Sequence, residues 1–260
     1  MPNLFDFRCA VVTGGAGGIG KAIAQDFIAR GKAVLLVGRT EAKLRATADE
    51  IGAAGYYVLD VGQTSEIRAA AAKMRSEHPE IDCLVNNAGV QRPLDIVKDG
   101  DFLPKADEEI DINIRGPMHL TLELLPHLQS KRAALVINVS SILGFVPFSI
   151  INPVYNGTKA WLHFWSLNLR TQLQQQGSAV RVVEIAPPTV GTDLHRDRED
   201  PDDNKKDKNS DALTVDEFMR EVAEKLERGD ETISAGMGEG LVNKWYEAYG
   251  DTYNKAASGK

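Results

Sequence analysis

Short apolar runs alternate with longer amphipathic stretches along most of the chain. Apolar runs predict six strands, at 8–13, 33–37, 56–59, 83–85, 133–139 and 179–185, the first of them buried. Amphipathic stretches predict helices at 18–30, 41–51, 65–77, 108–129, 153–176 and 214–228. Strands that are apolar throughout and separated by helices are typical of a parallel sheet covered on both faces. The pattern therefore predicts a doubly wound α/β fold with three layers, α/β/α, in strand order 3-2-1-4-5-6.

No linker interrupts this pattern, so we expect residues 1–260 to form a single domain. The segment 193–213 includes an almost wholly charged run, which predicts a solvated, mobile loop that could close over a substrate. The segment 238–260 contains four aromatic residues. Their spacing predicts a C-terminal helical extension that packs on the body or on a second subunit.

Composition narrows the class of protein. Of 260 residues, 43% are hydrophobic and 26% charged, as in ordinary globular proteins. The net charge of -7 argues against a broad nucleic-acid-binding surface. Neither a signal-peptide core nor an apolar run of about 20 residues is present, so we expect a cytoplasmic protein without a membrane partner. The histidines lack metal-ligand spacing, and Cys9 and Cys83 are expected to be reduced core thiols.

A glycine-rich loop joins the first predicted strand to the first helix. Gly15, Gly17 and Gly20 fit a GxGxxG pattern, whereas Gly14, Gly18 and Gly20 fit a TGxxxGxG pattern. In either register, backbone amides at the start of a helix could approach a dinucleotide diphosphate. The loop also resembles a nucleotide triphosphatase P-loop, but Ala22 stands where that loop needs a hydroxyl for magnesium. A dinucleotide site is therefore favoured, and with it a Rossmann-type sheet.

The end of the second strand indicates which dinucleotide is preferred. A carboxylate there would bind the ribose diol of NAD, whereas an arginine would bind the 2′-phosphate of NADP. The chain has Gly38 followed by Arg39, and no carboxylate before Glu41. NADP(H) is therefore favoured over NAD(H), with Arg39 as the selecting residue.

Tyr155 and Lys159 stand four residues apart in a predicted helix, so they share one face. A tyrosine normally titrates near ~10, too high for proton transfer at neutral pH. A neighbouring ammonium favours the phenolate and lowers the tyrosine pKa. The pair therefore predicts a tyrosine that acts as a general acid or base.

These motifs, taken together, resemble the short-chain dehydrogenase/reductase family. The resemblance spans roughly residues 8–192 and rests on Thr13-Gly14-x-x-x-Gly18-Ile19-Gly20, Asp60-Val61, Asn86-Asn87-Ala88-Gly89, Asn113, Ser140-Ser141-x-x-Gly144, Tyr155-x-x-x-Lys159 and Pro187-x-x-Val190-x-Thr192. Sequences around the serines and around Pro187-Pro188 are similar to a subgroup named after a lipoteichoic-acid D-alanylation operon. That name indicates no substrate.

The resemblance implies a role for each motif. It implies that Tyr155 transfers the proton, that Lys159 also holds the nicotinamide ribose, that Asn113 anchors a water relay, and that a serine orients the substrate carbonyl. Coenzyme contacts are implied for Gly14, Gly18, Ile19, Gly20, Asp60, Val61, Asn87, Ala88, Gly89, Tyr155, Lys159, Pro187, Val190 and Thr192. It also implies a homodimer or homotetramer, commonly formed through the helices at 108–129 and 153–176.

Two departures from the family pattern affect these expectations. The serine-to-tyrosine spacing is one residue longer than usual, and counting back from Tyr155 gives Ile142, which lacks a hydroxyl. Alignment on Gly144 selects Ser141, with Ser140 as the alternative. The usual Pro-Gly after the sixth strand is Pro187-Pro188, which loses an amide donor and stiffens the loop.

The expected function is NADP(H)-dependent hydride transfer between nicotinamide and a carbonyl or alcohol group of a small molecule, acting on CH–OH groups. No metal is required. The alternative is a protein that senses NADP(H) without turnover. A hydroxy acid or amino acid substrate stays open, because the polar Gln91 and Arg92 follow the cofactor turn.

Overall fold

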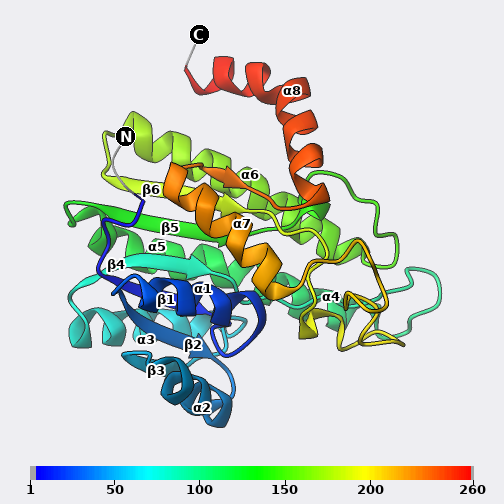
Figure 1. Cartoon of the computed structure of the whole chain (residues 1–260), viewed down its shortest axis with the longest axis horizontal. Helices are drawn as coiled ribbons and strands as arrows, with labels where there is room; N and C mark the ends of the chain where they lie inside the picture. Colours follow the sequence, from blue (N-terminus) through cyan, green and yellow to red (C-terminus); the bar gives the residue numbers. More distant parts are fainter. Residues whose placement is uncertain (1–3, 259–260) are drawn as a thin grey trace.

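A single parallel sheet forms the centre of the molecule and separates two layers of helices (Figure 1). The computed structural model describes residues 4–258. Its strands are β1 (Cys9–Thr13), β2 (Ala33–Gly38), β3 (Gly55–Val58), β4 (Ile81–Asn86), β5 (Ala134–Val139), β6 (Val180–Ile185) and β7 (Thr232–Ile233). They lie in the order β3-β2-β1-β4-β5-β6-β7, which confirms the predicted order of the first six. β7 was not predicted, because two residues are too few to show a period.

The helices follow the strands in the expected alternation. They are α1 (Gly18–Ala29), α2 (Glu41–Ile51), α3 (Thr64–Glu77), α4 (Phe102–Ile110), α5 (Gly116–Gln129), α6 (Pro153–Gln175), α7 (Val215–Arg228) and α8 (Met237–Ala257). Short 3-10 turns occupy Ile142–Gly144 and Asp193–His195, and a π-helical segment occupies Asp111–Arg115.

Two apolar cores lie on opposite faces of the sheet. On one face, Val12 of β1 belongs to the core that contains Phe27 of α1 and Phe218 of α7. On the other, Val11 belongs to the core that contains residues of α3, α5 and α6. Successive side chains of a strand point to opposite faces, so both faces of the central strands must be apolar. The continuous apolar runs in the sequence therefore predicted a strand buried on both sides.

The predicted helix at 108–129 needs correction. The helical stretch begins earlier, at Phe102, and is divided between α4 and α5 by the π-helical segment. Pro117 is the second residue of α5 and directly follows the π-helical segment and Gly116. A π segment has no sequence signature of its own, and such segments occur frequently at functional sites.

The C-terminal extension is helical, and its packing on the body is visible in the described residues. The helix α8 lies at the top of Figure 1 and contacts α6. Trp245 packs edge-to-face on His163, with ring centroids 4.6 Å apart, and Tyr253 donates a hydrogen bond to the Leu167 carbonyl. Residues 259 and 260 of the predicted extension lie outside the described residues. Within residues 4–258, no helix has both the length and the apolar character that a bilayer crossing requires.

Candidate active site

A large cavity opens at the carboxyl ends of the strands, where open α/β sheets bind their ligands. It has a volume of about 630 Å³. Most of the predicted site residues line it: Gly14, Gly18, Ile19, Arg39, Asp60, Val61, Asn87, Ala88, Gly89, Ser141, Tyr155, Lys159, Pro187, Val190 and Thr192. Gly20 and Asn113 do not line it, although both were predicted to act there. The sheet therefore brings segments that are far apart in sequence to one cavity.

The glycine loop is shaped by close backbone packing. Gly14 has a φ of 64°, which favours glycine, and a Cβ on it would lie 2.8 Å from Asn87 Nδ2. A Cβ on Gly20 would lie 2.5 Å from the Gly14 carbonyl oxygen. Gly20 is thus required for packing of the loop against itself and Asn87, rather than as a surface of the cavity.

The start of α1 fits a dinucleotide diphosphate. Gly17 occupies the N-cap position, and no side chain caps the first turn. A Cβ on Gly17 would meet no atom within 4 Å, so the loop faces open space at this point. The first amide protons of a helix lack intrahelical acceptors and carry positive potential. The loop could therefore bind an anionic group without rearrangement.

The end of β2 presents cations to the same cavity. Arg39 is about half exposed, and its Nη1 lies 3.9 Å from carboxylate oxygens of both Asp60 and Glu108. Such long, exposed contacts contribute little and leave the guanidinium free to bind an anion. Lys43, in the first turn of α2, also lines the cavity and was not identified from the sequence. Two cations therefore lie where a 2′-phosphate is expected.

Tyr155 and Lys159 lie one turn apart on α6 and are both buried. The Lys159 ammonium donates a 2.9 Å hydrogen bond to the Val139 carbonyl at the end of β5. It also lies 5.4 Å from the centroid of the Tyr155 ring. The helix thus holds the phenol and the amine together at the cavity wall.

Burial dominates the ionisation of both groups. It raises the pKa of Tyr155 above its usual value, and the nearby Glu109 charge raises it further, whereas a hydrogen bond with Ser141 lowers it. Burial lowers the pKa of Lys159 to about 8, against the charges of Glu109 and Glu184. The sequence predicted a lowered tyrosine pKa. In the protein alone the pKa is raised, because desolvation of the phenolate and the Glu109 charge outweigh the hydrogen bond with Ser141 and the Arg198 charge.

The two candidate serines have different surroundings, although both line the cavity. Ser140 Oγ donates a 2.5 Å hydrogen bond to Glu184 Oε1. Ser141 Oγ accepts a hydrogen bond from the Leu143 amide, and its interaction with the Tyr155 phenol lowers the pKa of that group. The hydroxyl that is associated with the tyrosine is therefore that of Ser141.

Asn113 lies in the π-helical segment, behind the cavity wall. Its Oδ1 accepts from the Val90 amide at 3.0 Å, and its Nδ2 donates to the Val90 carbonyl at 2.8 Å and to Thr158 Oγ1 at 3.2 Å. The side chain therefore ties the loop after β4 to α6 next to Lys159. Both protons of the Asn113 amide are thus used, whereas Oδ1 accepts only one hydrogen bond and can accept a second.

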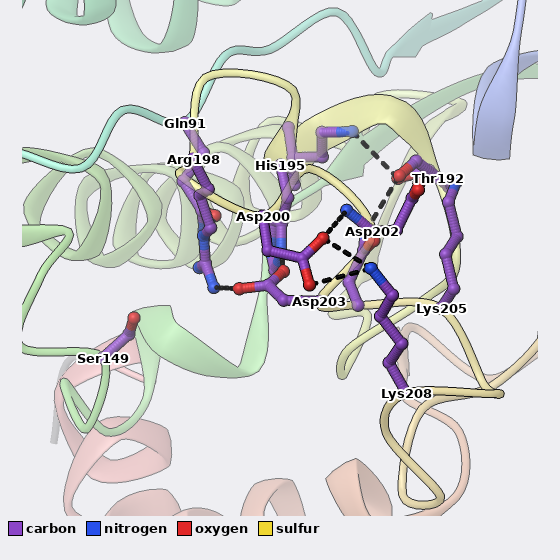
Figure 2. A network of polar contacts seen from close by, with 12 residues as sticks. Gln91, Ser149, Thr192, His195, Arg198, Asp200, Asp202, Asp203, Lys205 and Lys208 are labelled. Atoms are coloured by element: carbon purple, nitrogen blue, oxygen red, sulfur yellow. Dashed lines mark hydrogen bonds and ion pairs between the residues drawn. The ribbon is translucent and has the colours of Figure 1, made fainter.

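The charged segment 193–213 is attached to the cavity rim by a polar network (Figure 2). Arg198 donates to Asp203 at 2.6 Å, to Gln91 at 2.9 Å and to Asn152 at 3.0 Å. His195 pairs with the other oxygen of Asp203. The segment thus contacts the loop after β4 and the start of α6. Its mobility stays a prediction.

Asn152 occupies the predicted N-cap position of α6, but its side chain does not cap the helix. Instead, its Nδ2 donates to the Arg92 carbonyl at 3.0 Å, and its Oδ1 accepts from Ser149 and Arg198. The local sequence favoured capping, whereas the tertiary contacts use the side chain to connect three loops.

Two buried carboxylates near the site were not identified from the sequence. Glu109 on α4 has no exposed surface, and within residues 4–258 neither of its oxygens has a hydrogen-bond partner. Burial raises its pKa to about 7. Glu184 on β6 is also fully buried. A lone acidic residue in a helix or strand pattern carries no signal that it points inward, so only the structure could reveal these two.

Comparison with known proteins places the chain in a family. A profile described as short chain dehydrogenase matches residues 8–203. The chain is 33% identical over 231 residues to the uncharacterized oxidoreductase DltE of Bacillus subtilis, covering 89% of each protein. It is 35% identical over 217 residues to the NADP-dependent 3-hydroxy acid dehydrogenase YdfG of Escherichia coli K12, covering 82% of the chain and 86% of the relative.

Solved structures agree with this placement. A short-chain dehydrogenase from Sphingobium yanoikuyae in complex with NADPH has a TM-score of 0.83 at 22% identity, covering 96% of this chain and 95% of that one, and shows the fold. A serine dehydrogenase complexed with NADP+ has a TM-score of 0.75 at 32% identity, covering 87% and 94%. The chain therefore belongs to the short-chain dehydrogenase family.

Proposed function

We propose that this protein is an NADP(H)-dependent oxidoreductase that transfers hydride between nicotinamide and a carbonyl or alcohol group of a small molecule. The observation that carries the proposal is the position of Tyr155 and Lys159 in the wall of the cavity that the glycine loop also lines. One cavity thus contains both a diphosphate-binding loop and an acid/base group. That combination matches an enzyme acting on CH–OH groups.

The residues present fit NADP(H). The uncapped start of α1 would bind the diphosphate, and Arg39 and Lys43 would bind the 2′-phosphate. Among the relatives, YdfG is named as NADP-dependent and the serine dehydrogenase structure contains NADP+. These two relatives support NADP(H) over NAD(H) for this chain.

The reaction requires a proton at the substrate oxygen. When bound, the coenzyme supplies or accepts the hydride at the substrate carbon. In reduction, Tyr155 gives its proton to the oxygen that develops negative charge, and in oxidation it removes that proton. The Ser141 hydroxyl orients the same oxygen, and the Lys159 ammonium stabilises the phenolate that forms. Asn113 holds α6 against the loop after β4 through its bonds to Thr158 and Val90.

The cavity wall near Tyr155 supports a small substrate with both apolar and polar parts. Phe148, Gln91 and Arg198 all line the cavity. Phe145 does not line the cavity and packs on His163 with ring centroids 4.0 Å apart. No observation specifically favours a sensor, because both Tyr155 and Lys159 are present and buried at the cavity.

The test is oxidation of NADPH with a panel of aldehydes, ketones and oxo acids, followed by absorbance. We expect turnover with at least one compound and a loss of at least about a hundredfold in Tyr155→Phe, the usual contribution of general acid–base catalysis. NADPH binding, measured by fluorescence, should persist in the variant. Turnover that is unaffected by Tyr155→Phe would rule out the tyrosine mechanism. Absence of turnover with every compound tested would rule out the proposed enzymatic function.

A further inference from the structure

Behind Lys159, three polar side chains form a buried hydrogen-bonded unit. Ser140 Oγ donates to Glu184 Oε1 over 2.5 Å, and His163 Nδ1 lies 2.8 Å from Glu184 Oε2. His163 and Glu184 have no exposed surface, and Ser140 is almost as buried. We call these residues the Ser140–Glu184–His163 unit. The proposed reaction makes no direct use of any of them.

The backbone fixes this unit next to the catalytic lysine. On α6, His163 follows Lys159 by one turn and shares its face. The Lys159 ammonium donates to the carbonyl of Val139, which directly precedes Ser140. The unit is therefore attached to both elements that hold the ammonium, α6 and the end of β5. Glu184 reaches this point from β6, where it stands opposite Asn138 of β5.

Glu184 has the partners that a buried negative charge needs. A hydroxyl and an imidazole nitrogen engage one carboxylate oxygen each, and an ionised carboxylate accepts on both. Glu109 is different, because neither of its oxygens has a hydrogen-bond partner within residues 4–258. Of the two buried carboxylates that act on Lys159, Glu184 is thus the one that the fold holds in place.

We propose that the Ser140–Glu184–His163 unit is the fixed counter-charge that keeps Lys159 in its ammonium form, with Glu184 as a positioning residue for the reaction. Glu184 acts through Lys159 and contacts neither substrate nor coenzyme. The inference rests on the proposed function, because only catalysis by Tyr155 requires a charged lysine beside it.

The pKa of Lys159 depends on burial and on the charged and titratable groups around its ammonium. Burial lowers the pKa of Lys159, and the charges of Glu109 on α4 and Glu184 on β6 raise it. Tyr155 and the titratable His163 stand on the same helix as Lys159, and His163 contacts Glu184. On the far side of the unit, burial raises the pKa of Tyr246 on α8, and Glu184 contributes in the same direction. Of the two carboxylates, Glu109 has the larger effect on Lys159, and loss of the Glu184 charge leaves Glu109 alone to oppose desolvation.

The test is a direct titration of Lys159 by NMR in protein labelled with carbon-13 at the lysine ε position. The resonance is assigned by its loss in Lys159→Met. In Glu184→Gln we expect the titration midpoint to fall by about one pH unit, the shift typical of removing a nearby opposite charge. Glu247→Gln is the matched control, because Glu247 is exposed on α8, and its midpoint should equal that of the wild type.

Two further variants keep the test decisive if Glu184→Gln fails to fold. Ser140→Ala and His163→Asn each disturb one partner of the carboxylate and should lower the midpoint less. An unchanged Lys159 midpoint in the folded variants overturns the inference. This titration needs no substrate, so its failure is distinct from absence of turnover in the wild type, which would overturn the proposed function and the positioning role with it.

Discussion

Gly144 and Lys159 are packed so closely that a Cβ on Gly144 would lie 2.5 Å from the Lys159 carbonyl oxygen. Backbone cannot yield as a flexible side chain can, so Gly144→Ala should push α6 away from the turn after β5. We expect a loss of about 1–3 kcal/mol in the free energy of unfolding and a lower kcat, because the shift displaces Lys159. Denaturant unfolding and steady-state kinetics measure the two effects.

Gly157 provides the control for this substitution. It lies on the same helix, two residues from Tyr155, and a Cβ on it would meet no atom within 4 Å. Gly157→Ala should stabilise the protein by up to about 1 kcal/mol through helix propensity and leave kcat unchanged. Equal kinetic damage in both variants would show that the close contact at Gly144 is not the cause.

Coenzyme selection should depend on Arg39. Removal of a charged hydrogen bond to the 2′-phosphate in Arg39→Ala should weaken NADPH binding about ten- to a hundredfold, while NADH binding changes little. Arg45→Ala is the matched control, because Arg45 lies on α2 and pairs with Glu41. Fluorescence titration with both coenzymes measures the ratio, and a wild-type ratio in Arg39→Ala would exclude Arg39 as the selector.

Glu109 should make stability depend on pH. Burial is the chief cause that raises the pKa of Glu109 from its usual 4.5 to about 7. The folded state therefore binds a proton that the unfolded state has lost, and this contribution to stability declines as pH rises from about 4.5 through 7. Glu109→Gln removes the titration. The free energy of unfolding of the variant should therefore rise relative to that of the wild type across this window, by up to about 3 kcal/mol at pH 8.

Urea unfolding at pH 5 and at pH 8 measures this difference between the two proteins. Glu108→Gln, at the neighbouring and half-exposed position, is the control and should show little pH-dependent gain. A stability difference between Glu109→Gln and wild type that is the same at both pH values would contradict the assignment.

Arg198 should hold the charged segment against the cavity rim. Arg198→Ala removes its bonds to Asp203, Gln91 and Asn152. We expect amide hydrogen exchange in peptides covering 193–213 to accelerate about tenfold, with a raised KM. Arg196→Ala is the control, because Arg196 donates to Asp193 within the same segment. Unchanged exchange in Arg198→Ala would show that other contacts hold the segment.

The sequence predicted the first six strands, because they depend on local pattern. Most of the residues that the family resemblance implied for the site line the cavity, and their roles there stay predictions. Continuous apolar runs determine β1 to β6. Gly14 and Asn87 directly follow β1 and β4, and Tyr155 reaches the same cavity from the first turn of α6. The glycine positions were also informative. Gly14 has a φ of 64°, which favours glycine, and the tight contact at Gly20 leaves no room for a side chain.

What the sequence missed depends on tertiary contacts. The upward shift of the Tyr155 pKa follows from burial, which no sequence motif reveals. His163 has no metal-ligand spacing in the sequence, and its partner Glu184 lies 21 residues away on another element. The π-helical segment at Asp111–Arg115 likewise has no pattern in a single sequence.

Hydride transfer itself can be followed most directly with NADPH that carries deuterium at the transferred position of the nicotinamide. After turnover with a carbonyl substrate, mass spectrometry of the product should find one deuterium on the former carbonyl carbon. In Tyr155→Phe the same labelled product should form at least about a hundredfold more slowly. A product without deuterium, or labelled product formed at the wild-type rate in the variant, would contradict the account.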